Sequence, residues 1–123
     1  MPLITKEAIA AALSAHAQWK KRLQDAIATG KSEFTPGVVT KDNACQFGQW
    51  LYSLSPPDTL SVEFQKVKAL HANFHKVAAD ILTLALTGKK SEALEMLEHG
   101  GAYVQATGKL VLALGAWQNT IRD

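Results

Sequence analysis

The chain has 123 residues, 47% of them hydrophobic and 20% charged, which indicates one globular domain over residues 1–123 rather than a disordered chain. Its net charge is only +2, and its lysines and arginines are spread along the chain, so the composition argues against a protein that binds nucleic acid or a membrane surface. No apolar run approaches the ~20 residues of a transmembrane helix, and the N-terminus lacks the charged start and apolar block of a secretory signal.

The first predicted helix runs from Lys6 to about Thr29. Thr5 is a suitable N-cap because its hydroxyl can accept a hydrogen bond from a free amide of the first turn, and Gly30 ends the helix. Apolar residues recur along this segment with a helical period. His16 lies on the same face as these residues, with Trp19 close to one turn further, so His16 is expected to point into the core.

A loop is expected over residues 31–41, which contain a proline and a glycine and show no helical period, with a short extended piece possible at residues 38–39. A short second helix follows, with Asp42 as its N-cap and Leu54 as its approximate end. This places Cys45 in the first turn, where the helix dipole favours a thiolate. A Ser-Pro-Pro-Asp sequence then stops the helix.

The third predicted helix runs from about Thr59 to Leu86 and contains two histidines, His71 and His75, spaced four residues apart. Its apolar residues step by three and four, which predicts one buried face. That face comprises Leu60, Phe64, Val67, His71, Phe74, Ala78, Ile81 and Ala85. His71 therefore belongs to the buried face, and His75 lies one turn further along, at its edge.

The fourth predicted helix runs from about Glu92 to Thr120, after a tight turn at residues 88–90 and an N-cap at Ser91. Its apolar face is predicted to comprise Leu94, Leu97, Gly101, Val104, Gly108, Val111 and Gly115. A glycine recurs there every seven residues, although each lowers helix stability by about 1 kcal/mol relative to alanine. The repetition suggests close backbone approach to another helix, in the same bundle or in a second subunit.

These patterns predict an all-α fold, since no segment shows a strand-like alternation of useful length. Three long helices and one short helix, with short connections after the second and third, indicate an antiparallel four-helix bundle. The chain has a single cysteine, which excludes an internal disulfide and suggests a reducing compartment and either a metal ligand or a reactive thiol.

His71 and His75 have the spacing by which one helix face offers two nitrogens to one metal ion. In a bundle, His16 from the first helix and Cys45 from the second can complete the set. Three imidazoles and one thiolate make a tetrahedral set suited to Zn²⁺. These ligand types argue against Mg²⁺ and Ca²⁺, which prefer oxygen, and less strongly against Fe²⁺, Co²⁺ or Cu⁺.

A metal-free interpretation of the same residues stays open at this point. His71 can be a hydrogen-bonded core histidine, His16 an amphipathic core residue, and Cys45 a small buried hydrophobic residue. His99 has no partner in the pattern and is expected at the surface.

Three short motifs stand in this order along the chain: His16-Ala-Gln-Trp19, Cys45-Gln-Phe-Gly48-Gln-Trp50 and His71-Ala-Asn-Phe-His75. They resemble the motifs of the chemoreceptor zinc-binding (CZB) domain family, which are His-x-x-Trp, Cys-x-Phe/Leu-Gly-x-Trp and His-x-x-x-His. The resemblance covers nearly the whole chain, and three spaced motifs are far more specific than any one of them. It implies a zinc ion bound by His16, Cys45, His71 and His75.

The resemblance also implies a cytoplasmic bacterial regulatory domain that is often a homodimer. Members of the family are typically fused to soluble chemoreceptors or to diguanylate cyclases, so chemotaxis or cyclic di-GMP signalling is the implied output. The zinc-bound cysteine can be a target of oxidants such as hypochlorous acid. Because this chain contains no cyclase or receptor segment, it is expected to be a stand-alone member or a domain of a longer protein.

Two other classes of function remain as alternatives. A hemerythrin-like iron- or oxygen-binding bundle would need more histidines and several inward carboxylates, of which only Glu33, Glu63 and Asp80 are near. A purely structural bundle would dimerise through the glycines of the fourth helix and bind no metal. An enzyme is not expected, because no acid–base pair in an evident cleft and no phosphate-binding loop can be recognised.

Overall fold

The computed structural model describes residues 4–98 and 100–121, and all regular structure over these residues is helical. In chain order the elements are α1 (Lys6–Ala17), α2 (Trp19–Thr29), α3 (Pro36–Val39), α4 (Gln46–Ser53), the 3₁₀ helix η1 (Asp58–Leu60), α5 (Val62–Leu86), α6 (Lys90–Leu97) and α7 (Ala102–Thr120). None of the helices in this described part combines the length and the apolar character needed to cross a membrane.

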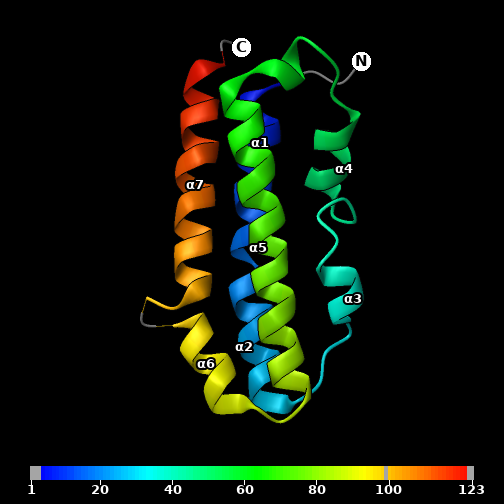
Figure 1. Cartoon of the computed structure of the whole chain (residues 1–123), viewed down its shortest axis with the longest axis vertical. Coiled ribbons are helices and arrows are strands. Elements are labelled where there is room, and N and C mark those ends of the chain that lie inside the picture. The colour runs from blue at the N-terminus through cyan, green and yellow to red at the C-terminus, as the bar shows by residue number, and fades with distance from the viewer. Residues whose placement is uncertain (1–3, 99, 122–123) are drawn as a thin grey trace.

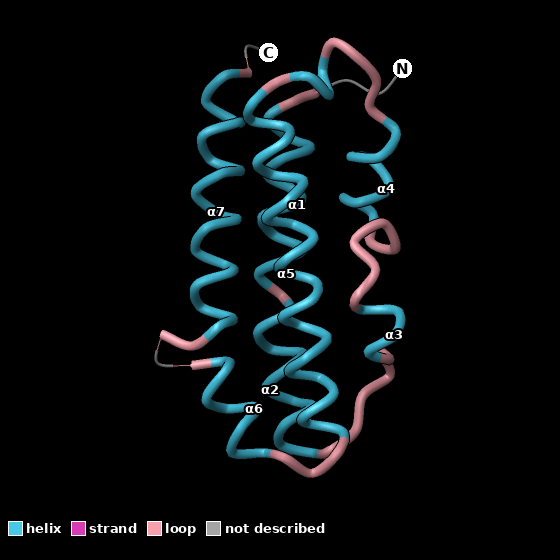
Figure 2. The backbone as a smooth tube through the Cα atoms, in the orientation of Figure 1, coloured by secondary structure: helices cyan, strands magenta, loops and turns pink. Residues whose placement is uncertain are grey.

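The helices form four columns that alternate in direction (Figure 1; Figure 2). The first column is α1 followed by α2, the second is α3 followed by α4, the third is α5, and the fourth is α6 followed by α7. The long helix α5 contacts α2, α3, α6 and α7, so its buried face forms the centre of the core. The predicted helical bundle is therefore confirmed, although several helix boundaries differ from the prediction.

The first column begins and ends where the sequence predicts. The Thr5 hydroxyl accepts a hydrogen bond from the Ala8 amide at 3.1 Å, and Gly30 closes α2 with a φ of 71°. The predicted single helix is divided at Gln18, whose φ and ψ stay in the right-handed helical region. As a result α2 continues in the direction of α1 (Figure 1), and both His16 and Trp19 are buried.

The second column differs from the prediction in two places. Residues 36–39 form one helical turn inside the predicted loop, where a short extended piece had been considered for residues 38–39, because Pro36 at the first position has a φ that suits a helix. The N-cap of α4 is Cys45 and not Asp42, so the predicted helix start was three residues early. Asp42 lies in the preceding turn, where its carboxylate accepts a hydrogen bond from the Tyr52 hydroxyl at 2.8 Å.

The helix α5 carries the buried face predicted for the third helix, with one exception. The buried residues include Phe64, Val67, His71, Phe74, Ala78, Ile81 and Ala85. Leu60 is 74% exposed, because it lies in η1 before Ser61 caps α5 by accepting a hydrogen bond from the Phe64 amide at 3.0 Å. His75, which was expected at the edge of this face, is buried as well.

The fourth column is broken where one continuous helix had been predicted. The helix α6 starts at Lys90, with Lys89 and not Ser91 at the N-cap, and it ends at Leu97. Gly100 follows with a φ of 76°, and a Cβ on Gly101 would collide with a carbonyl oxygen of α6. These two glycines permit the sharp connection from which α7 restarts.

The break also shifts the buried face of α7. Tyr103, Ala106, Leu110, Ala113, Leu114 and Trp117 are buried. Leu94, Val104 and Val111, which were predicted to be buried, are 39%, 42% and 46% exposed. Val104 and Val111 lie beyond the break, and a helix that restarts after a break does not keep the phase of the preceding helix. A Cβ on Gly108 or Gly115 would meet no described atom within 4 Å, so the predicted close approach of these glycines within the bundle is wrong.

Gly48 is a position where the fold requires glycine, because a Cβ there would collide with the backbone carbonyl of Asp42. We expect Gly48→Ala to lower the free energy of unfolding by about 2 kcal/mol or more, since a backbone group must move. Gly108→Ala is the matched control and should raise the same quantity by about 0.5–1 kcal/mol, because its new methyl group meets no described atom within 4 Å. Urea denaturation of both variants measures the difference, and equal effects would contradict this account of Gly48.

Candidate metal centre

Four side chains from three columns meet inside the bundle: His16 of α1, Cys45 at the start of α4, and His71 and His75 of α5. One potential ligand atom from each lies within 4.8 Å of all the others. The Nε2 atom of His71 lies 3.0 Å from His16 Nε2 and 3.0 Å from His75 Nε2. The structure thus brings together all the candidate ligands of the sequence, while His99 lies outside the described residues.

Local structure fixes where each of these side chains points. The four-residue spacing on α5 places the rings of His71 and His75 with their centroids 4.5 Å apart. Cys45 is held by its role as N-cap, in which Sγ accepts a hydrogen bond from the Gly48 amide at 3.2 Å. That sulfur lies 3.4 Å from His71 Nε2 and 3.5 Å from His75 Nε2.

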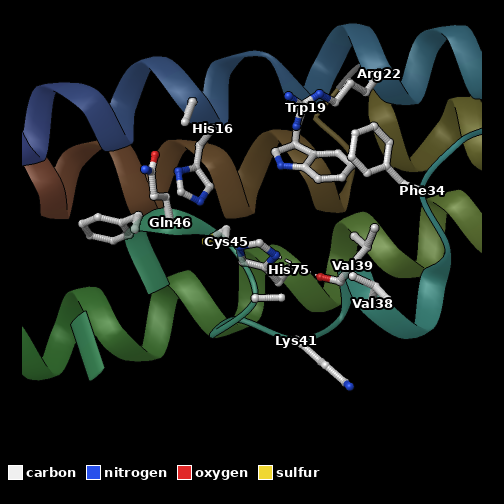
Figure 3. A pocket seen from close by; sticks show the side chains of 13 residues that line it. His16, Trp19, Arg22, Phe34, Val38, Val39, Lys41, Cys45, Gln46 and His75 are labelled. Carbon is white, nitrogen blue, oxygen red and sulfur yellow. Dashed lines mark hydrogen bonds between the residues drawn. The ribbon is translucent and has the colours of Figure 1, made fainter. Parts of the chain in front are cut away.

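Two of the imidazoles form a hydrogen bond with a backbone carbonyl group through Nδ1, the ring nitrogen that does not face the other ligand atoms. His16 Nδ1 donates to the Ala12 carbonyl at 2.7 Å, and His75 Nδ1 donates to the Val39 carbonyl at 2.9 Å (Figure 3). Because a carbonyl oxygen only accepts, the proton of each neutral ring lies on Nδ1, and Nε2 carries a bare lone pair. Both of these nitrogens lie against His71 Nε2.

The centre of the cluster therefore holds two bare acceptors, and the protons within reach of them are those of His71 Nε2 and of the Cys45 thiol. His71 Nε2 could donate a proton to one neighbouring imidazole but not to both. His71 Nδ1 is buried and has no hydrogen-bond partner among the described residues, so nothing there fixes the proton of this ring. Three nitrogens and one sulfur that converge on one point form a set that a metal cation can bind together, in place of these shared protons.

Four of the six separations among the ligand atoms are close to those of a small tetrahedral ion, and the other two are no longer than 4.8 Å. With Zn–N bonds of about 2.0–2.1 Å and a Zn–S bond of about 2.3 Å, the tetrahedron has N–N edges of about 3.3 Å and N–S edges of about 3.6 Å. The shortest N–N separations of 3.0 Å and the S–N separations of 3.4 and 3.5 Å approach these edges. Over the described residues the cluster is the one group able to hold a metal, and it contains no carboxylate, so a hemerythrin-like site is not supported.

Burial determines the protonation of the three histidines. Burial, together with the neighbouring His75 and His16 rings, lowers the pKa of His71 from 6.5 to about 2. Burial also lowers the pKa of His16 and of His75, against the opposing effect of their carbonyl hydrogen bonds. All three rings are neutral near pH 7, which is the form that binds a metal.

The cysteine behaves differently from what its place at a helix start suggests. Burial raises the pKa of the Cys45 thiol, and the amide hydrogen bonds from Gly48 and Phe47 oppose this effect only in part. The predicted preference for a thiolate is therefore wrong for the chain without a metal. A bound cation supplies the missing stabilisation, because a coordinating thiol is deprotonated.

Aromatic rings pack against the imidazoles of the cluster. The Phe47 ring stands edge-on to His71, with centroids 5.1 Å apart, and Phe74 stands edge-on to His16 at 5.2 Å. These rings and the two carbonyl partners orient the imidazoles. The two carbonyl partners cannot be predicted from the sequence, because every residue has a backbone oxygen whatever its side chain.

The lowered pKa values predict that the metal-free protein loses stability in acid. Below pH 6.5 the histidines of the unfolded chain take up protons, whereas His71 in the folded chain stays neutral until about pH 2. The unfolded state then binds more protons, so the free energy of unfolding falls as the pH falls. We expect His71 alone to contribute a slope of about 1.4 kcal/mol per pH unit in urea denaturation of zinc-free protein between about pH 6 and about pH 4.

The matched variant for this measurement is His71→Gln, which lacks the titrating ring. Its slope should be smaller than that of the wild-type chain by the contribution of one histidine. A slope that stays the same in the variant would show that His71 does not titrate in this way.

The comparison with known families agrees with this geometry. The chemoreceptor zinc-binding domain (CZB) matches residues 16–82, more than half of the chain, and that span contains the whole cluster. No curated protein and no solved structure gives a significant match. The family and the donor atoms of the cluster both identify zinc as the cofactor. The chain therefore belongs to the chemoreceptor zinc-binding domain family.

Proposed function

We propose that this chain is a zinc-binding regulatory domain in which His16, Cys45, His71 and His75 hold one Zn²⁺ ion. The observation that carries this assignment is the convergence of the imidazole Nε2 atoms, two of them left bare by carbonyl hydrogen bonds on the opposite side of the ring. The family match supports zinc over other metals that accept nitrogen and sulfur ligands.

The proposed coordination favours regulation over catalysis. Four protein ligands fill a tetrahedral site, so no open position remains for an activated water. We therefore infer a sensory role for the centre and no enzymatic reaction.

Cys45 is the ligand through which the centre would control the fold. It is the one proposed ligand in the second column, whereas the three histidines lie on α1 and α5. The second column is held at a further point by the hydrogen bond between His75 and the Val39 carbonyl. Loss of the sulfur–zinc bond would loosen α3 and α4 from the other columns and provide a two-state element that a partner can read.

Oxidation of Cys45 is one signal that would break this bond. In the net reaction, the thiolate and hypochlorous acid give a sulfenic acid and chloride, a two-electron oxidation of sulfur. A sulfenic acid is a poorer zinc ligand than a thiolate. The second proposed signal is a fall in the concentration of free zinc, which would release the bound ion and loosen the same column.

We further propose that the domain acts in the bacterial cytoplasm as a homodimer and controls chemotaxis or cyclic di-GMP signalling through a chemoreceptor or diguanylate cyclase partner. The association of the family with chemoreceptors supports the setting. Exposed apolar side chains on α7, namely Val104, Val111 and the 76% exposed Leu112, support a dimer surface on this helix.

The zinc assignment predicts about one zinc per purified chain, measured by elemental analysis. The double variant His71→Ala/His75→Ala should lose the metal, because half of the ligand set is gone. Adding zinc to the metal-free wild-type chain should raise its melting temperature, since the ion binds the folded state. The same samples give the molecular mass by light scattering, and a monomer would contradict the proposed dimer.

Asp80→Ala is the control for the zinc measurement, because Asp80 is exposed on the same helix and does not belong to the cluster. It should keep the zinc content of the wild-type chain. A wild-type chain that takes up no zinc, with an unchanged melting temperature, would instead favour the metal-free structural bundle.

The role of Cys45 predicts that about one equivalent of hypochlorous acid releases zinc and increases amide hydrogen exchange in residues 36–53 more than in α5. Mass spectrometry should locate the oxidation at Cys45. The Cys45→Ser variant should bind zinc more weakly and show no such change in exchange. A variant with full zinc affinity and the wild-type response to the oxidant would contradict both proposed signals.

A further inference from the structure

A cavity of about 290 Å³ opens beside the proposed zinc centre, between α2, α3 and the start of α4 (Figure 3). His16, Cys45 and His75 line it toward the centre, while Trp19 and Phe34 line it further along the chain direction of α2. The two aromatic rings lie 5.1 Å apart between centroids and form an apolar wall. Neither the proposed coordination nor the packing of the columns explains why this space is open.

The guanidinium group of Arg22 lies beside the aromatic wall, and hydrogen bonds to described residues use few of its N–H donors. Its guanidinium carbon lies 4.9 Å from the ring centroid of Trp19 and 4.9 Å from that of Phe34. It donates one hydrogen bond to the side chain of Gln18 at 3.3 Å, and no described carboxylate forms an ion pair with it. Because a guanidinium carries five N–H donors, most of them remain for a ligand.

The surrounding charges favour an anion in this cavity. If the proposed function holds, Zn²⁺ with one thiolate and three neutral imidazoles gives the centre a net charge of +1, and Arg22 adds a second positive charge. Lys41 lines the cavity as well. The opposing carboxylate is that of Asp42, and it already accepts the Tyr52 hydroxyl. The balance is positive, so a negative ligand is attracted.

We propose that this cavity binds a small organic anion with a flat, apolar body, whose carboxylate pairs with Arg22 and whose body packs against Trp19 and Phe34. The inference rests on the proposed function only for the charge of the zinc centre. The volume sets the size of the ligand at on the order of ten non-hydrogen atoms, since a water molecule occupies about 30 Å³. A ligand in this position covers the approach to the Cys45 sulfur and would regulate the access of oxidants to it.

The test uses the zinc-loaded chain and two probes of the same shape, benzoate and the neutral benzamide. Binding is followed by nuclear magnetic resonance at the indole N–H of Trp19, with Trp50, which does not line this cavity, as the internal reference. We expect benzoate to bind at least about tenfold more tightly than benzamide. The Arg22→Gln variant should lose that tenfold preference, whereas Lys21→Gln, which removes a charge from the next residue at the surface, should keep it.

Three outcomes would overturn the proposal: no shift of the Trp19 signal up to about 10 mM benzoate, equal binding of the two probes, or an unchanged preference in Arg22→Gln. Zinc content measured before and after the titration separates this proposal from the proposed function. A chain that holds no zinc contradicts the proposed function, while the response of the probes to Arg22→Gln still decides the binding site. Loss of zinc on adding benzoate would also overturn the proposal, because the probe would then act on the metal.

Discussion

Three imidazole nitrogens and one sulfur converge in a part of the core where aromatic rings pack against the imidazoles. The lone pairs of His16 Nε2 and His75 Nε2 both face His71 Nε2, which has at most one proton to offer them. The two carbonyl hydrogen bonds aggravate this conflict, because they hold the bare nitrogens of His16 and His75 toward His71. A cation bound by these nitrogens and by the sulfur would resolve this conflict.

The second column depends on this centre more than the other columns do. The helices α3 and α4 have 4 and 8 residues, and helices of such length are not stable by themselves in water. Their connection to α5 includes the sulfur of Cys45 and the carbonyl of Val39, both of which lie at the cluster. If the proposed function holds, a metal centre that holds these two short helices would convert a change in coordination into a change in shape.

The parts of the fold that the sequence predicted are those set by regular spacing. His71 and His75 follow from the four-residue period of one helix, and the helix that carries them was placed within three residues of its true start. The predictions failed where the chain leaves regular structure. Gly100 and Gly101 reset the phase of α7, so the buried face extrapolated across them was wrong.

The sequence predicted which residues belong to the candidate site, but it did not predict the contacts and the cavity that surround them. Motif spacing identified His16, Cys45, His71 and His75, and the structure brings them together. The collision that makes Gly48 necessary, the use of Cys45 itself as the N-cap, and the cavity beside Trp19 depend on how the loop before α4 folds back. Such contacts arise from tertiary structure, and no local period encodes them.

The acceptors behind His16 and His75 are main-chain oxygens, and every amino acid carries one. An exchange of the side chain at Ala12 or Val39 leaves its carbonyl in place as long as the helical turn keeps its course. Substitution of the side chain at either position therefore leaves the hydrogen bond to the imidazole, and with it the basicity of the ring, unchanged. In an evolutionary record, residues 12 and 39 would look as unconstrained as their neighbours in the core, although the backbone there sets which nitrogen of each ring faces the ion.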